Sequence, residues 1–408
     1  MTISDSLISL DTLSSLLAAC LVLLLGTIVT RRVAALERYS IPSPVVGGLL
    51  FALAVVVLSR MTGQAVVLQN SVKTDLLLLF FACVGLTSDL RLLLRGGPRL
   101  LRFLAALLPF LVLQNALGVL VAGLLGLHPF MGLVAGTITL IGGHGTGAAY
   151  ADKFAASTGI PGLMGLTMTS ATLGLVAGAL VGGPVGERLI RRFGLGSDPA
   201  PRSDPASGDV IMGPPETPIS TVPMIGALAV ALVAVFVGQA LARSLAGSPV
   251  TVPDFLLCLL AGLVLRNVGP YVGLKLHDPS MDLLGSVCLS IFLAWTMMAL
   301  DLGSIAQTAG PLLVILAAQT LLVVLWAYFV TFRLVGRDYE GATMSAAFCG
   351  FAMGATATAI ANMQALARRH GPAPQAFLIV PIVGAFFVDI ANAIVLTGFL
   401  SLDIMQLR

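Results

Sequence analysis

The stretch that decides the fold is Thr137-Ile138-Thr139-Leu140-Ile141-Gly142-Gly143-His144-Gly145-Thr146-Gly147-Ala148-Ala149. It lies in an apolar background, yet it combines several glycines with a histidine and three hydroxyl groups. A regular helix disfavours this composition, because each interior glycine costs about 0.8–1 kcal/mol relative to alanine. Irregular backbone at membrane depth persists only where it is buried in protein or lines a cavity. The stretch therefore predicts a binding site built on broken helices.

The overall composition is that of an integral membrane protein. Of 408 residues, 57% are hydrophobic and 10% are charged, whereas soluble domains carry about 25% charged residues. The net charge of +3 is small and no basic run suggests a nucleic-acid partner. The five cysteines lie in apolar runs without metal-ligand spacing, so we expect no disulfide, zinc site or cofactor.

Apolar runs follow one another along the whole chain, and several approach the roughly 20 residues that a spanning helix needs. The first, Thr12–Thr30, follows Asp5 and Asp11 rather than a basic segment, so we interpret it as a retained helix. The proline-rich, polar segment 186–220 is expected to be a linker between an N-terminal half, 1–185, and a C-terminal half, 221–408. The other expected spans are Pro44–Ser59, Thr74–Leu90, Phe103–Leu125, Ile160–Val185, Pro223–Leu241, Phe255–Leu265, Met281–Leu300, Pro311–Phe332 and Phe377–Leu400.

The two halves share a layout, which predicts an internal repeat. Landmark residues recur in the same order at offsets between 209 and 212 positions: Pro42 and Pro253, Asp89 and Asp301, Gly145 and Gly354, Gly174 and Gly384. Asp89 and Asp301 each end a span and are expected to be solvated. Each half also contains one glycine-rich, interrupted segment, 131–154 in the first and 341–367 in the second.

The positions of the basic residues predict the topology, because lysine and arginine favour cytoplasmic loops. If both interrupted segments are re-entrant, the chain has ten spans, both termini are periplasmic and the linker is cytoplasmic. The cytoplasmic side then receives 17 of the 22 basic residues. They are Arg31, Arg32, Arg38, Arg91, Arg95, Arg99, Arg102, Arg188, Arg191, Arg192, Arg202, Arg266, Lys275, Arg333, Arg337, Arg368 and Arg369. If both segments span fully, the division is 11 and 11, so the charges favour two inverted repeats of five spans.

Inverted repeats with broken helices are typical of secondary transporters, whose site lies near the midplane. We expect the two glycine-rich tips to meet there. The first tip is expected to bind substrate through Gly143, His144, Gly145, Thr146 and Gly147. If a short helix begins near Thr146, its free N–H groups favour an anion. The alternatives are that the glycines permit close helix packing and that His144 is a structural hydrogen-bond donor.

The second tip and the last span carry further polar residues. Thr358 and Asn362 share a helix face and offer oxygen ligands suited to a hard cation. Asp389 lies deep in the last span, where a carboxylate is a functional candidate by default, and Asn392 follows one turn later. The alternatives are that Thr358 bonds back to its own helix and that Asp389 and Asn392 form a structural pair.

Weaker polar candidates lie inside other spans: Ser170, Thr172, Gln114 and Asn115. Asn115 is as consistent with a contact between helices as with a binding site.

The sequence resembles the bacterial sodium/glutamate symporter family along nearly its whole length. Four stretches carry the resemblance: Tyr39-Ser40-Ile41-Pro42-Ser43-Pro44-Val45-Val46-Gly47-Gly48, Gly143-His144-Gly145-Thr146-Gly147-Ala148-Ala149, Ala359-Ile360-Ala361-Asn362-Met363-Gln364, and Val380-Pro381-Ile382-Val383-Gly384-Ala385-Phe386-Phe387-Val388-Asp389. Two departures are Leu140-Ile141, where a serine is common, and Ala355-Thr356-Ala357-Thr358, where a proline is frequent.

The resemblance implies an all-α, multi-pass protein of the bacterial inner membrane that imports glutamate with sodium. It also implies a homodimer of two inverted five-helix repeats, each with a re-entrant hairpin, and an elevator-like motion. On this hypothesis the first tip and Thr356 bind a substrate carboxylate, while Thr358, Asn362, Asp389 and Asn392 bind sodium. Asp389 could instead accept the substrate ammonium.

Three alternatives remain at this point. The first is a symporter of another dicarboxylate or amino acid, such as citrate or aspartate. The second is an intramembrane enzyme that uses His144 and Asp389, although no serine or cysteine nucleophile accompanies them in a motif. The third is a channel, for which the sequence lacks a charged ring or filter signature.

Overall fold

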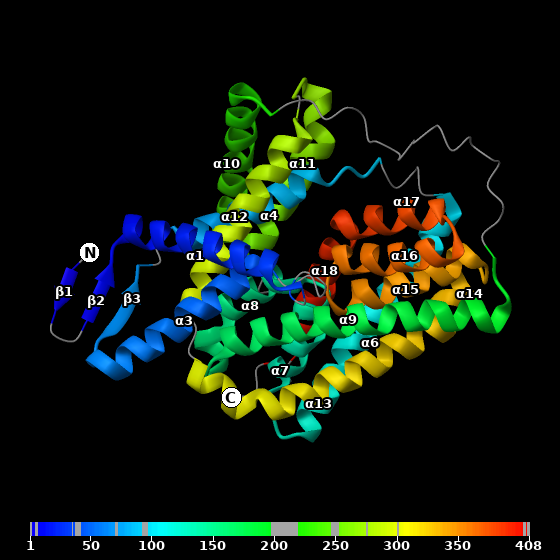
Figure 1. Cartoon of the computed structure of the whole chain (residues 1–408). Helices are drawn as coiled ribbons and strands as arrows, with labels where there is room; N and C mark the ends of the chain where they lie inside the picture. Colours follow the sequence, from blue (N-terminus) through cyan, green and yellow to red (C-terminus); the bar gives the residue numbers. More distant parts are fainter. Residues whose placement is uncertain are drawn as a thin grey trace.

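The computed structural model describes residues 2–4, 7–34, 36, 42–69, 72–91, 97–196, 219–245, 253–274, 276–299, 302–402 and 405. Most of these residues are helical, and the helices form two groups (Figure 1). Most of the linker expected at 186–220, together with Asp301, Lys275 and the first residues of the Tyr39 motif, lies outside the described residues.

The first group, here called the first bundle, contains three helices from each half of the chain. They are α1 (Thr12–Arg32), α3 (Ser43–Thr62), α4 (Lys73–Thr87), α10 (Thr221–Ser244), α11 (Asp254–Val268) and α12 (Asp278–Met298), and a short 3-10 turn, η2 (Gly269–Val272), follows α11. Glycine pairs bring these helices close. A Cβ on Gly85 of α4 would lie 2.0 Å from the Leu259 carbonyl oxygen of α11. Small residues at such crossings let membrane helices pack backbone to backbone.

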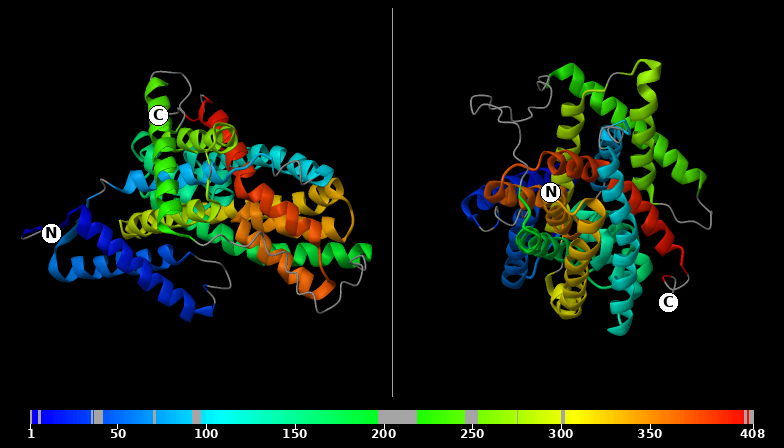
Figure 2. Two further views of the ribbon diagram at one scale, coloured as in Figure 1. Left: turned by 90° about the horizontal axis from the view of Figure 1, so that it is seen from above. Right: turned by 90° about the vertical axis from the view of Figure 1, so that its right-hand side faces the viewer.

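The second bundle contains the remaining helices and both interrupted segments. Its members are α6 (Gly97–Leu124), α7 (Pro129–Leu133), α8 (Gly143–Thr158), α9 (Leu163–Phe193), α13 (Leu302–Trp326), α14 (Phe332–Val335), α15 (Tyr339–Met353), α16 (Thr356–His370), α17 (Pro374–Ile382) and α18 (Val388–Leu400). Three π-helical turns, η1 (Val134–Ile138), η3 (Ala327–Thr331) and η4 (Val383–Phe387), interrupt them. Figure 2 separates the bundles in its left panel, with α1 and α3 at one end and α15 and α16 at the other.

Both interrupted segments are helical hairpins. The first comprises α7, η1, a turn and α8, and the second comprises α15 and α16, with the break at Gly354 and Ala355. The residues 131–154 and 341–367 therefore coincide closely with two hairpins. We call them hairpin 1 and hairpin 2.

Eight helices of the described residues are long and apolar enough to cross a membrane. The expected spans Thr74–Leu90 and Phe377–Leu400 are not among them. The first forms α4, which has 15 residues, and the second is interrupted by η4. The described residues thus support a polytopic membrane protein.

Two local features differ from the sequence analysis. A small sheet joins β1 (Thr2–Ser4) antiparallel to β2 (Leu7–Leu10), which pairs in parallel with β3 (Ala65–Leu68). The valines of β3 suit a strand better than a helix. In addition, α9 continues to Phe193 and ends at Gly194 with φ of 60°, so the start of the linker at 186 lies inside a helix.

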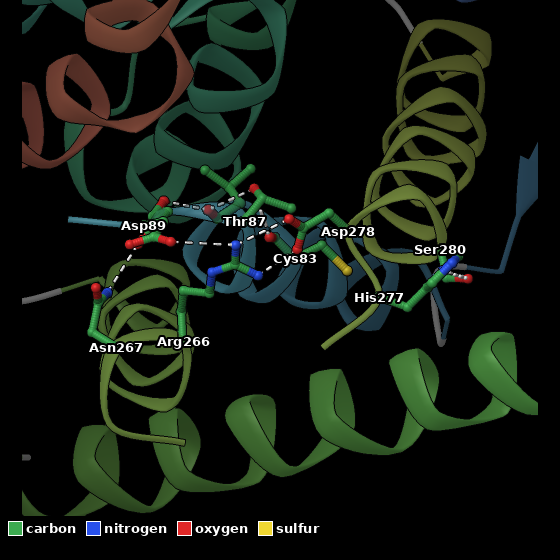
Figure 3. A network of polar contacts seen from close by, with 10 residues as sticks. Cys83, Thr87, Asp89, Arg266, Asn267, His277, Asp278 and Ser280 are labelled. Atoms are coloured by element: carbon green, nitrogen blue, oxygen red, sulfur yellow. Dashed lines mark hydrogen bonds and ion pairs between the residues drawn. The ribbon is translucent and has the colours of Figure 1, made fainter. Parts of the chain in front are cut away.

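An ionic cluster ties three helix ends of the first bundle together (Figure 3). Arg266 of α11 forms two hydrogen bonds to the Asp278 carboxylate, one of them 3.0 Å long, and lies 3.7 Å from Asp89. Asn267 donates to the Ser88 carbonyl oxygen at 2.9 Å. Asp89, which was expected to be solvated, is therefore held in an ion pair that joins α4 to α11.

One face of α8 forms much of the contact between the two bundles. Tyr150 packs edge-on against Phe255 of α11, with ring centroids 5.2 Å apart. The Lys73 ammonium of α4 contacts the Asp152 carboxylate at 2.8 Å. Hairpin 1 is thus one of the elements of the second bundle that adjoin the first bundle, and the π-helical turn η4 is another through its contact with α4.

Candidate functional site

Both hairpins pack against helix α9. Both pack along its glycine-containing face. A Cβ on Gly174 would lie 2.4 Å from the Met353 carbonyl oxygen of hairpin 2 and 2.5 Å from Leu140 of hairpin 1. Real Cβ atoms do not approach so closely, so only glycine lets both hairpin ends reach α9 at this level.

The two glycine-rich tips meet. Gly143 has φ of +64°, which favours glycine, and a Cβ placed on it would lie 3.7 Å from the Gly354 carbonyl oxygen. Helix α8 begins at Gly143, three residues before the expected position near Thr146. No side chain caps the N-terminus of α8 or of α16. Two helix N-termini with free N–H groups therefore lie close to one contact point, an arrangement that favours anions.

The glycines of the first tip serve different contacts. A Cβ on Gly145 would lie 3.1 Å from both Phe80 and Leu289 of the first bundle, and one on Gly147 would lie 2.8 Å from Thr167 of α9. Gly147 thus makes the close helix packing that was the alternative interpretation, while Gly143 faces the second tip. Thr146 follows within the first turn of α8.

His144 is buried, with 7% of its surface exposed, and its Nε2 lies 3.0 Å from the Thr172 hydroxyl of α9. That hydroxyl donates its proton to the Met168 carbonyl oxygen at 2.9 Å. The imidazole must then donate through Nε2. His144 therefore ties the first tip to α9 by a hydrogen bond, as in the structural interpretation, and retains Nδ1 as a second polar atom.

The three polar residues of the second tip, Thr356, Thr358 and Asn362, have different surroundings. Thr356 packs against the last span, since a Cβ on Gly384 would lie 2.3 Å from its Oγ1. Thr358 is 1% exposed, and its hydroxyl has no hydrogen-bond partner among the described residues. The alternative in which Thr358 bonds back to its own helix is therefore wrong. Asn362 donates to the carbonyl oxygens of Gly178 and Ala346 at 3.1 and 3.3 Å.

Asn392 links the last span to hairpin 1. Its Nδ2 donates to the Thr137 carbonyl oxygen at 3.0 Å, and its Oδ1 is buried without a partner among the described residues. Asp389, one turn earlier, is partly buried, and no hydrogen bond or ion pair joins it to another described residue. The two side chains therefore do not form the structural pair that was the alternative, and both retain free oxygen atoms.

Two consecutive residues of α6 hold both hairpins. Gln114 donates to the Ala352 carbonyl oxygen of hairpin 2 at 3.0 Å. Asn115 Oδ1 accepts from the backbone N–H and the hydroxyl of Thr137 in hairpin 1, both at 3.0 Å. The Asn115 contacts arise where Gly136 departs from helical geometry, with ψ of −138°. Gln114 and Asn115 thus satisfy backbone groups that the broken helices leave free.

Sequence reasoning missed two members of this polar layer, Gln319 and Thr137. Gln319 of α13 donates to the Gln114 carbonyl oxygen at 2.8 Å. It is fully buried, and an amide inside the expected span Pro311–Phe332 was the signal available. The role of Thr137 depends on the local break in the helix, which the sequence alone does not locate.

Replacing Asn115 with leucine is expected to destabilise hairpin 1. The change removes the acceptor of two hydrogen bonds, and an unpaired buried donor costs about 1–3 kcal/mol. We expect a lower unfolding midpoint of the detergent-purified protein, followed by tryptophan fluorescence. Thr137→Val removes only the hydroxyl and should cost less. Equal midpoints for the Asn115→Leu and unmodified proteins would contradict the assignment.

Comparison with known proteins shows which family the chain belongs to. The family model described as sodium/glutamate symporter matches residues 8–372. A sodium/glutamate symporter of Escherichia coli (strain K12) is 42% identical over 403 residues, covering 97% of this chain and 98% of the relative. One from Haemophilus influenzae (strain ATCC 51907 / DSM 11121 / KW20 / Rd) is 40% identical over 390 residues, covering 95% and 96%.

These relatives are transporters, which removes the intramembrane enzyme and the channel from the alternatives. The match also includes the residues of both hairpins. The chain belongs to the sodium/glutamate symporter family.

Proposed function

We propose that the protein imports glutamate together with sodium across the bacterial inner membrane, and that glutamate binds between the tips of the two hairpins. The observation that carries this proposal is the close approach of Gly143, where the uncapped helix α8 begins, to Gly354, two residues before the uncapped helix α16 begins. A dicarboxylate can accept hydrogen bonds from both termini, and each helix dipole favours the negative charge. The relatives are sodium/glutamate symporters, and their substrate and ion are the ones proposed here.

In the first tip, the N–H groups of Gly143, His144 and Gly145 at the start of α8 take one carboxylate, while Thr146 and Gly147 complete the first turn of that helix. In the second, the start of α16 and the Thr356 hydroxyl take the other. His144 holds the first tip against α9 through Thr172 and offers Nδ1 toward the substrate.

Sodium binds to oxygen atoms that lack a protein donor. The Thr358 hydroxyl and the Asn392 Oδ1 are buried and unpaired among the described residues. The Asp389 carboxylate adds the negative charge. Asn362, anchored by its Nδ2 to two carbonyl oxygens, offers its Oδ1 as a further ligand. Hard cations prefer such oxygen ligands, and sodium offsets part of the charge of the anionic substrate.

Transport proceeds by alternating access, with the second bundle moving against the first. The arrangement supports this in one respect: each half contributes its first three helices to one bundle and its hairpin to the other. The proposal includes two inverted five-span repeats, periplasmic termini, a cytoplasmic linker and a homodimer in which the first bundle stays fixed. Each sodium ion that enters the cell releases roughly 2.3 kcal/mol of free energy per 100 mV of membrane potential.

Uptake of labelled glutamate into proteoliposomes, with and without an inward sodium gradient, tests the function. We expect uptake that depends on sodium and is inhibited by unlabelled glutamate. Uptake that is indifferent to sodium would refute the coupling. Stronger inhibition by citrate or aspartate than by glutamate would favour another dicarboxylate or amino acid as the substrate.

Thr358→Val is expected to raise the sodium concentration for half-maximal uptake by about tenfold without destabilising the protein. Valine is nearly isosteric, and removing an unpaired buried hydroxyl leaves no partner unsatisfied. The measurement is the sodium dependence of uptake beside the unfolding midpoint. Thr343→Val is the matched control, because this buried hydroxyl of hairpin 2 bonds to the Tyr339 carbonyl oxygen of its own helix. Identical sodium dependence in both variants would remove Thr358 from the ion site.

A further inference from the structure

A groove of about 450 Å³ runs between α9 and α13, away from the hairpin tips. Leu180 and Leu325 belong to its apolar part, and Arg188, Arg192 and Tyr328 form its basic end. We call it the α9–α13 groove. Its lining is apolar on one side and cationic on the other, and no step of substrate or sodium binding uses it.

The apolar part opens outward. Leu180 is 52% exposed and Leu325 is 45% exposed. Both belong to helices that are long and apolar enough to span a membrane. Their exposed faces therefore meet lipid chains rather than water.

The basic end is already arranged to receive an anion. Arg192 donates to the Tyr328 hydroxyl at 3.0 Å and lies over the Tyr328 ring. Arg188 is exposed and has no hydrogen-bond or ion-pair partner among the described residues. The nearby acid, Glu187, is occupied by Arg191 and His370. Further arginines, Arg333 and Arg337, line an adjoining hollow that shares Arg192 and Tyr328.

The length of the groove matches one leaflet. Leu180 and Arg192 lie twelve residues apart on α9, which corresponds to about 18 Å at 1.5 Å per residue. Half of a hydrocarbon core of roughly 30 Å is about 15 Å. A chain that lies along the apolar part would thus bring its headgroup to the arginines.

We propose that the α9–α13 groove binds an anionic phospholipid of the cytoplasmic leaflet, with one acyl chain along Leu180 and Leu325 and the phosphate at Arg188 and Arg192. The choice of leaflet rests on the topology in the proposed function. Basic pockets between membrane helices on the cytoplasmic side suit such headgroups. Glutamate does not fit, because it has no apolar part to fill the groove. A second copy of the chain would have to bring a carboxylate to these arginines, and Glu187, the nearest acid in the chain, is already held by Arg191 and His370.

The test is lipid binding to the detergent-purified full chain, measured by native mass spectrometry with phosphatidylglycerol and, separately, phosphatidylcholine. This readout does not require transport, so it stands even if the substrate or coupling ion is wrongly assigned. We expect phosphatidylglycerol to bind at least tenfold more tightly than phosphatidylcholine. The double variant Arg188→Gln and Arg192→Gln should lose that preference. Arg32→Gln, at the end of α1 and outside the groove, is the matched control and should keep it.

A second variant tests the acyl chain. Leu325→Trp fills the apolar part and should weaken phosphatidylglycerol binding while the arginines remain. Soluble glycerol phosphate should not compete. Equal lipid preference in the double variant, equal loss in Arg32→Gln, unchanged binding in Leu325→Trp, or full competition by glycerol phosphate would each overturn the proposal.

Discussion

Glutamate uptake by the Asp389→Asn variant is expected to fall on the order of 100-fold, which corresponds to about 3 kcal/mol. The carboxylate lies in the last span, one turn before Asn392, and no other described residue pairs with it. A charge in such surroundings is costly to maintain, so its free energy must be recovered when a cation binds. Asparagine keeps the shape and the amide oxygen but removes that attraction.

The measurement is initial uptake in proteoliposomes at matched protein incorporation, with the unfolding midpoint as a check of folding. Asp75→Asn is the control, because Asp75 is an exposed carboxylate in the first turn of α4. We expect that variant to transport as the unmodified protein does. Normal uptake by a folded Asp389→Asn variant would exclude the residue from both sodium and substrate binding.

Gly174→Ala is expected to lower the unfolding midpoint and to abolish most uptake. The added methyl group would lie 2.4 Å from the Met353 carbonyl oxygen and 2.5 Å from Leu140. Overpacking of this kind costs about 1–3 kcal/mol, and the shift that relieves it moves both hairpin tips away from α9. Because the tips form the proposed substrate site, the loss of uptake should exceed the loss of stability.

The same helix supplies the control. A Cβ on Gly183 would meet nothing within 4 Å, so Gly183→Ala should be neutral or slightly stabilising through helix propensity. Uptake and unfolding midpoint are measured for both variants. If Gly174→Ala and Gly183→Ala behave alike, the close approach of the hairpins at Gly174 does not matter for function.

The sequence predicted the two hairpins, but it did not predict the hydrogen bonds that hold them in place. Glycine clusters at Gly143 and Gly354 identify broken helices, because interior glycines destabilise a continuous helix but suit the irregular backbone of a break. The partners of Asn392 and Asn115 could not be predicted, because both bonds reach a carbonyl or N–H group exposed by the π-helical turn before Gly142. A π-helical turn depends on tertiary packing, which leaves no clear periodic signal in the residues themselves.

The residue at which each helix ends could also not be predicted from the hydrophobic pattern alone. Segment 186–193 is polar, yet it continues α9 because Gly186 packs against Leu366 and because Gly194 supplies a left-handed cap. Asp89 looked solvated, but Arg266 reaches it from a helix nearly 180 positions later in the chain. Contacts between distant segments therefore decide what the local composition leaves ambiguous.

The neighbouring positions of Gln114 and Asn115 restrict how this protein can vary. One peptide bond separates the residue that holds hairpin 2 from the residue that holds hairpin 1. An insertion of one residue earlier in α6 would rotate both side chains by about 100° around the helix axis. The hydrogen bonds to hairpin 1 and to hairpin 2 would therefore be lost together. The two hairpins are thus held at a fixed position relative to each other by a single helix. Both hairpins therefore depend on one and the same helical register of α6.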